Sequence, residues 1–279
     1  MPLPLPASLS PSKVSSFTDC ALAFRFSAID RLPEPPSLAA TRGTLVHAAL
    51  ERLFCLDGPE RTLAAALACL DEAAAAMADH PDVVGLGLDD AEHAQLLADA
   101  RHLVEQYFRL EDPQTITPIG IELKLEVSLD GLRLRGIIDR LELDGDGNLV
   151  VTDYKTGRAP GEAQEQQRLA GVAFYSLLCE RLFGRRPAKI QLLYLSEPVA
   201  IIATPSDRTT RGVERRLAAI WSAVERACER EDFRPNPSRL CDWCAFKAYC
   251  PAFGGDLAKA DEHRRQLEAA EASRQLQVV

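Results

Sequence analysis

Residues 135–157, RGIIDRLELDGDGNLVVTDYKTG, hold two apolar stretches joined by the turn-forming segment DGDGN. This pattern predicts an antiparallel hairpin with strands at 132–143 and 149–155. A turn centred on Asp146 pairs residues whose numbers sum to about 292, so Asp139 should face Asp153. Lys155 lies two residues beyond Asp153 and therefore points to the same face of the sheet.

The two facing acids lie among aliphatic residues of the hairpin. Opposed carboxylates repel each other and lose hydration on an apolar face. A divalent cation between them reverses this effect, and Mg²⁺ and Mn²⁺ prefer such hard oxygen ligands. An ordinary ion pair between Asp153 and Lys155 is the alternative, but it leaves Asp139 unexplained.

The rest of the chain alternates helical and strand patterns. Apolar residues at helical spacing predict helices at about 41–54 (capped by Thr41), 62–77, 89–110, 161–183 and 208–231. Alternating apolar residues predict strands at 119–129, 189–195 and 199–203. The order is helices, three antiparallel strands, helix, strand and helix, which predicts an α/β fold with a helical insertion at 60–112. A polar, helix-prone tail covers 255–279.

Composition excludes several classes of protein. The 279 residues carry 32 basic and 41 acidic side chains, and this net charge of −9 argues against a protein that simply coats nucleic acid. Arginines cluster at 181–186 and 208–216, and solvated helix faces are the usual explanation of such runs. The chain has no apolar run of membrane-spanning length and no signal-peptide pattern, so we expect a cytoplasmic protein with no membrane partner.

The eight cysteines fall into two groups. Cys55, Cys69, Cys179 and Cys228 are isolated in apolar, helix-like stretches and are expected to be core residues. Three others crowd into CDWCAFKAYC, as Cys241, Cys244 and Cys250. Such spacing predicts a metal or cluster site rather than disulfides.

Several of these motifs resemble the RecB-like branch of the PD-(D/E)xK nuclease superfamily, which includes the AddAB nuclease domains and the CRISPR-adaptation nucleases. The branch motifs G-x-x-D-R and D-Y-K-T-G are similar to 136–140 and 153–157. A family histidine four residues after a glycine corresponds to His47 after Gly43. The opening S-x-S-x-x-x-x-F-x-x-C is similar to residues 10–20. The resemblance covers about 10–253, except for the insertion.

The resemblance implies a single nuclease domain over 1–279, with a restriction-endonuclease-like core in which helices flank a mixed central sheet. It implies Mg²⁺- or Mn²⁺-dependent hydrolysis of DNA, by an exonuclease of DNA-end processing, repair or recombination. His47, Asp139, Asp153 and the carbonyl of Tyr154 would hold the metal, and Lys155 would orient the attacking water. The alternative is a catalytically silent DNA-binding or scaffolding subunit with the same fold and a structural Cys₄ metal site.

The resemblance also implies a 4Fe–4S cluster held by four thiolates, with 236–253 closing onto the N-terminal region. Its ligands would be Cys20, Cys241, Cys244 and Cys250; a structural zinc ion is the alternative. The Q-x-x-x-Y motif of the branch, which contacts DNA, is incomplete. Tyr175 fits it, but Gly171 replaces the glutamine and Gln167 is the nearest one. The implied partners are DNA with single-stranded ends and a helicase or repair protein, because the chain has no helicase motif. Glu122 lies on the polar face of its strand and is expected to be solvated.

Overall fold

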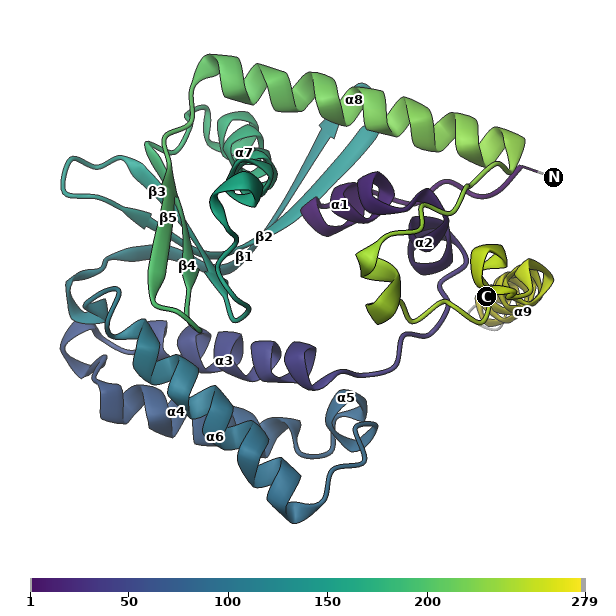
Figure 1. The fold of residues 1–279 in the computed structure, drawn as a ribbon. Helices are drawn as coiled ribbons and strands as arrows, with labels where there is room; N and C mark the ends of the chain where they lie inside the picture. The colour runs from purple at the N-terminus through teal and green to yellow at the C-terminus, as the bar shows by residue number, and fades with distance from the viewer. Residues whose placement is uncertain (1, 277–279) are drawn as a thin grey trace. The chain divides into compact units, whose positions relative to one another are not determined.

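A computed structural model describes residues 2–276, without the side chains of 162–172, 271–272 and 274–276. A run of helices opens the chain and is followed by three strands, one helix, two strands and the final helices (Figure 1). The α-helices are α1 (Pro11–Asp19), α2 (Ala21–Phe24), α3 (Leu38–Phe54), α4 (Leu63–Met77), α5 (Pro81–Val84), α6 (Asp90–Tyr107), α7 (Glu162–Phe183), α8 (Asp207–Arg230) and α9 (Leu257–Leu276). The strands are β1 (Pro118–Leu129), β2 (Leu132–Leu143), β3 (Leu149–Lys155), β4 (Lys189–Tyr194) and β5 (Val199–Ala203).

The chain divides into two compact units, each described here by itself. One unit, which we call the sheet unit, contains residues 36–127 and 135–213. The other, which we call the terminal unit, contains residues 1–35, 128–134 and 214–279.

The strands form one mixed sheet in the order β1-β2-β3-β4-β5. Strands β2 and β3 are antiparallel, β3 and β4 are parallel, and β4 and β5 are antiparallel. The β2–β3 register runs from Arg140 opposite Thr152 to Leu143 opposite Leu149, which confirms the predicted pairing. The paired positions end one residue short of Asp139 and Asp153. The expected mixed α/β fold is therefore confirmed.

The core of the sheet unit lies between the sheet and three helices. Helix α3 packs against α4 and α6 (Figure 1). Its apolar residues share one buried cluster with those helices and with Tyr154, Leu193 and Leu195. Helix α3 begins at Leu38, because Ser37 accepts a hydrogen bond from the N–H of Ala40 and caps it. The expected cap at Thr41 is therefore wrong.

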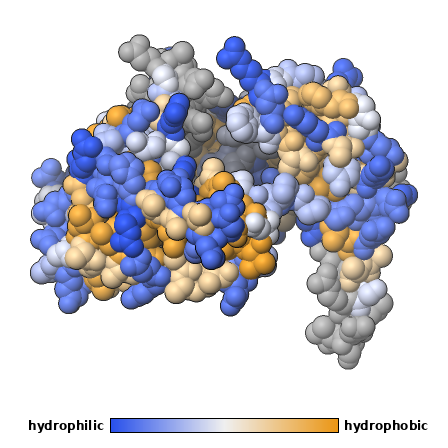
Figure 2. All heavy atoms as spheres, turned by 60° about the horizontal axis from the view of Figure 1, so that its bottom comes forward, coloured by the Kyte–Doolittle hydropathy of each residue, from blue (hydrophilic) through white to orange (hydrophobic). Residues whose placement is uncertain are grey.

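The region between residues 60 and 112 is helical, as expected. Thr62 caps α4, and Asp89 forms a capping box with Glu92 at the start of α6. Seen from the side of these helices, hydrophilic and hydrophobic residues alternate over the surface (Figure 2). Alanines supply much of the exposed apolar surface of α4. No helix in residues 2–276 is long and apolar enough to cross a membrane.

The terminal unit joins the two ends of the chain. Leu9 forms a parallel β-bridge with Leu134. Asp30 is fully buried and contacts two arginines, with its Oδ2 3.0 Å from Nε of Arg25 and its Oδ1 3.1 Å from Nε of Arg264. Both arginines also contact the partly exposed Asp261, so α9 is held to the N-terminal segment by compensating charges around the buried Asp30.

Candidate functional site

Three side chains from three elements of the sheet unit converge at one point. His47 comes from α3, Glu122 from β1 and Asp139 from β2. Nδ1 of His47 lies 3.6 Å from Oδ2 of Asp139 and 3.8 Å from Oε1 of Glu122. One ligand atom from each residue lies within 4.8 Å of the other two. One nitrogen and two carboxylates in this arrangement suit a divalent cation as a donor set.

Glu122 reaches this group because of its backbone conformation. Its φ of 46° is in the left-handed region, which a residue with a side chain adopts only at a cost in energy. The regular alternation of β1 is lost here, and residues 121–123 are all partly buried. The expectation that Glu122 is solvated on a polar face is therefore wrong. Alternation in the sequence predicts facing only where the strand is regular.

The third strand brings Asp153, Tyr154 and Lys155 beside this group. The N–H of Tyr154 donates a 2.6 Å hydrogen bond to Oδ2 of Asp139. The ammonium of Lys155 forms an ion pair with Oδ2 of the buried Asp153. Among the described residues, that oxygen accepts no hydrogen bond in good geometry. The predicted convergence of the two acids and the lysine on one face agrees with these positions.

Tyr175 lies beneath the acids instead of on the surface. It comes from α7, it is 9% exposed, and its hydroxyl lies 3.5 Å from Oδ1 of Asp153. Gly136 allows this packing, because a Cβ there would lie 2.8 Å from Leu178 and 3.2 Å from the ring of Tyr175. A DNA contact by Tyr175 stays a prediction, and the side chain of Gln167 lies outside the described residues.

The electrostatic surroundings fix the charge of two basic groups. Burial alone would lower the pKa of His47, but hydrogen bonds to Asp139 and Glu122 raise it to about 10. Burial opposes the charged form of Lys155 as well, yet Asp153 raises the pKa of the ammonium above its ordinary value. Without a bound metal, both groups are therefore cationic at neutral pH.

A second buried ionic group, centred on Arg140, supports β2 and β3 on the face of the sheet opposite to Asp139 and Asp153. Arg140 is fully buried, and its guanidinium lies 4.6 Å from the ring centroid of Phe54. Its nitrogens donate to Glu111 at 2.8 Å, to Glu142 at 2.5 Å and to the hydroxyl of Tyr154 at 2.7 Å. Further contacts reach Tyr107 and Thr152. Tyr154 is thus held at its ring by Arg140 and at its N–H by Asp139.

Four cysteines gather in the terminal unit. Cys20, Cys241, Cys244 and Cys250 line one small pocket, and none of them forms a disulfide. The N–H of Asn236 donates to Sγ of Cys20 at 3.4 Å, and the N–H of Ser238 donates to Sγ of Cys241 at 3.3 Å. Burial raises the pKa of the Cys244 thiol, and the other three cysteines raise it further. The predicted set is therefore brought together.

The remaining four cysteines only partly fit the expectation. Cys69, Cys179 and Cys228 are buried, as expected. Cys55 is exposed, because it follows the last residue of α3, so its assignment to the core is wrong.

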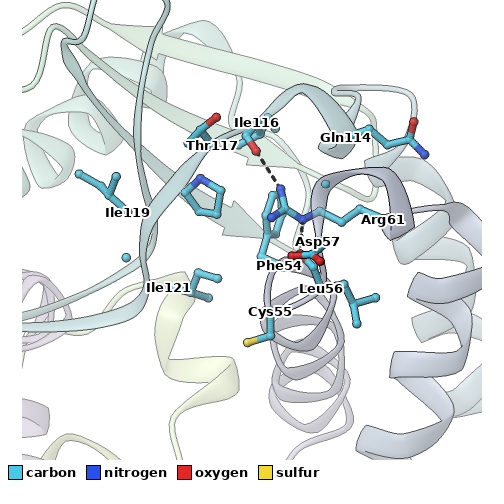
Figure 3. Close-up of a pocket in the computed structure, with 13 residues that line it drawn as sticks. Phe54, Cys55, Leu56, Asp57, Arg61, Gln114, Ile116, Thr117, Ile119 and Ile121 are labelled. Atoms are coloured by element: carbon cyan, nitrogen blue, oxygen red, sulfur yellow. Dashed lines mark hydrogen bonds between the residues drawn. The ribbon is translucent and has the colours of Figure 1, made fainter.

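A separate pocket of about 620 Å³ lies between the end of α3 and the start of β1 (Figure 3). Arg61 lines it, and its guanidinium donates to the carbonyl oxygens of Leu56 and Ile116 at 2.9 and 2.8 Å. None of the converging acids, the histidine or the lysine lines this pocket. These carbonyl oxygens are already bonded to Arg61, which connects the segment after α3 to the segment before β1. This points to a structural role for the pocket.

The mixed sheet carries the acids and the lysine on its strands, and α3 adds a histidine beside them. Residues 8–251 match the family model of the PD-(D/E)XK nuclease superfamily. Because this match covers most of the chain, the protein belongs to that superfamily.

Relatives from phages and a solved bacterial structure are similar to this chain. The Gene 69 protein of Mycobacterium phage D29 is 25% identical over 271 residues, which cover 88% of this chain and 96% of that protein. The Gene 69 protein of Mycobacterium phage L5 is 29% identical over 137 residues, which cover 48% of this chain and 45% of that protein. A candidate exonuclease from Eubacterium rectale has a TM-score of 0.54 at 12% identity, over 85% of this chain and 86% of that one. The last likeness concerns the fold.

Proposed function

We propose that this protein is a Mg²⁺- or Mn²⁺-dependent DNA nuclease of the RecB-like branch. The observation that carries the proposal is the convergence of His47, Glu122 and Asp139, with the Asp153–Lys155 ion pair on the neighbouring strand. A purely structural group would not need a strained backbone at Glu122 to bring a second acid beside Asp139.

The donor set fits a divalent cation. His47, Asp139, Asp153 and the carbonyl of Tyr154 would hold it, and Glu122 joins them on the evidence of its position. The buried carboxylate of Asp153, whose Oδ2 is paired with the Lys155 ammonium, would contribute to this donor set from the neighbouring strand. When bound, such an ion lowers the pKa of a coordinated water and polarises the phosphate.

The chain's own residues supply orientation and charge. The ammonium of Lys155 is held by Asp153, so it is fixed where it can orient a water and stabilise negative charge that develops on the phosphate oxygens. Tyr175 supports Asp153 from below, and the N–H of Tyr154 fixes one oxygen of Asp139. These contacts keep the reacting groups in place before substrate binds.

We propose that the four gathered cysteines hold a 4Fe–4S cluster, with structural zinc as the alternative. Four thiolates and no histidine suit such a cluster, and backbone N–H groups already donate to two of the sulfur atoms. The cluster would fasten residues 236–253 to the segment around Cys20 and so close a long loop of chain.

The finer aspects of the role are also proposals. We propose that the chain acts as one nuclease domain with a helical insertion at 60–112, and that it digests DNA as an exonuclease from ends with single-stranded character. We place it in DNA-end processing, repair or recombination, where a helicase would supply the unwound strand. The resemblance to the RecB-like branch supports these assignments.

Cleavage of end-labelled DNA tests the proposal against a catalytically silent DNA-binding or scaffolding subunit. We expect the purified protein to degrade labelled single- or double-stranded DNA with Mn²⁺ or Mg²⁺, and EDTA to stop it. Lys155→Ala should lower the rate by about 10²–10³, the usual effect of removing one positioned stabilising group.

The matched control is Lys259→Ala, which removes an exposed lysine of α9 and should leave the rate unchanged. Cleavage by Lys155→Ala at the wild-type rate would show that the assigned mechanism is wrong. A protein that binds DNA tightly but leaves it intact with either metal would be the silent subunit instead.

A further inference from the structure

Helix α8 has an arginine-rich face opposite its buried face. Between residues 214 and 230, Leu217, Val224 and Cys228 are at most 2% exposed. Arg215 and Arg226 are exposed, and at 100° per residue they project from the opposite side of the helix. Arg216 and Arg230, also exposed, border the same face.

Three of the four arginines of this face have no acidic partner among the described residues, whereas Arg230 lies near enough to Asp232 to lower the pKa of that carboxyl. In the part of the chain that the structure describes, Arg215, Arg216 and Arg226 have neither a hydrogen bond nor an ion pair. The acids of this stretch, Glu214, Glu225 and Glu229, lie along one flank of the face and not among the arginines. A chain with a net charge of −9 therefore presents a locally cationic surface along one helix.

The residues that separate Arg215 from Arg226 on this face are small. Ala219 and Ser222 lie on the same face between Arg215 and Arg226, and neither side chain is long enough to block a ligand. The eleven residue-to-residue steps from Arg215 to Arg226 span about 16 Å of helix axis. A nucleic-acid strand advances 3.4 Å per nucleotide, so this length corresponds to about five nucleotides.

We propose that the face formed by Arg215, Arg216, Arg226 and Arg230 binds the phosphate backbone of DNA. Guanidinium groups match phosphate in charge and in fork geometry, and a polyanion neutralises several of them at once. The inference rests on the proposed function for the identity of DNA as substrate. It adds a binding surface outside the group of His47, Asp139 and Lys155.

The salt dependence of DNA binding tests this surface. Binding of a fluorescent 30-base-pair duplex is measured by anisotropy in EDTA, which prevents cleavage, from 50 to 300 mM NaCl. The slope of log K against log salt is negative, and each lost phosphate contact reduces its magnitude by about 0.9. For Arg215→Gln/Arg226→Gln we expect the magnitude of the slope to fall by about 1.8 and binding to weaken about 30-fold at 0.15 M salt.

The control is Arg109→Gln/Arg265→Gln, which removes two exposed positive charges outside α8. Its net charge equals that of the α8 variant, so an effect of total charge alone would appear in both proteins. Glutamine and arginine have similar helix propensities, and we expect both variants to melt at the wild-type temperature.

Hydrolysis of thymidine 5′-(p-nitrophenyl phosphate) with Mn²⁺ separates this inference from the proposed function. This ester has no polynucleotide backbone, so both double variants should hydrolyse it at the wild-type rate. If wild type binds DNA and hydrolyses the ester, but the α8 variant binds with wild-type affinity and slope, the inference is overturned and the proposed function stands. That result would point to a solvated face or an acidic protein partner. A wild-type protein without binding or hydrolysis would overturn both.

Discussion

Oδ2 of Asp139 accepts a 2.6 Å hydrogen bond from the N–H of Tyr154, and the same oxygen lies 3.6 Å from Nδ1 of His47. One carboxylate thus connects strand β2 to strand β3 and to helix α3. Its charge is compensated even without a metal, because the half-buried His47 is protonated at neutral pH.

Asp139→Asn should destabilise the metal-free protein. Two facing acids considered alone would predict the reverse, because one of two like charges disappears. However, Asp139 is paired with His47, and Asp153 is paired with Lys155. Loss of a buried hydrogen bond to a charged group typically costs about 1.5–3 kcal/mol, and we expect a loss of this size in urea unfolding with EDTA. Asp146→Asn, in the exposed turn, is the control. An Asp139→Asn protein as stable as wild type would show that the repulsion dominates.

The stability of the metal-free protein should fall as the pH rises above neutral. Folding raises the pKa of His47 from 6.5 to about 10, so its contribution is complete below about pH 6.5 and is lost as the pH approaches 10. The measurement is the difference in unfolding free energy between wild type and His47→Gln, in EDTA at pH 6.5 and 9.5. Taking the difference removes the effect of groups common to both proteins. We expect the difference to shrink at the higher pH. An equal difference at both values would mean that His47 is neutral when folded.

Arg140→Met should strongly destabilise the sheet unit. The substitution leaves Glu142 and Glu111 without their buried cation, and breaking such a pair typically costs about 3–5 kcal/mol. Arg135→Met is the control on the same strand, because Arg135 is largely exposed and pairs only with Glu126, also exposed, among the described residues. An exposed pair contributes at most about 1 kcal/mol. Urea unfolding distinguishes the two variants, and similar midpoints would contradict the buried network.

Anaerobically purified protein should be brown and carry about four irons per chain. Cys20→Ser should remove the colour and lower the melting temperature, because the N-terminal segment loses its connection to residues 236–253. Cys69→Ser changes a buried cysteine of α4, outside the set, and should keep the colour. Iron analysis, zinc analysis and the visible spectrum are measured together. Colourless protein with one zinc ion would identify the structural zinc alternative and leave the nuclease proposal in place.

Local patterns in the sequence predicted much of the fold. The DGDGN turn fixed the pairing of β2 with β3, because a hairpin register follows from the position of its turn. Once the register is known, the facing of Asp139, Asp153 and Lys155 follows from the two-residue period of a strand. The bounds of β2, β3 and β5 agree with the expected ranges, because apolar residues between turn-forming segments mark these strands in the sequence. The start of α3 did not, because two residues in that stretch, Ser37 and Thr41, can cap a helix.

What the sequence by itself determined is therefore the hairpin, its acids and lysine, and the helical and strand elements around it, because these depend on neighbours along the chain. Only the tertiary structure decided that Glu122 turns toward His47, that Arg140 is enclosed by residues of α6, β2 and β3, and that Tyr175 lies under Asp153. These features depend on a left-handed backbone angle within β1 and on packing between distant segments. Both arise from the balance of burial, charge and strain in the assembled unit, which no local periodicity encodes.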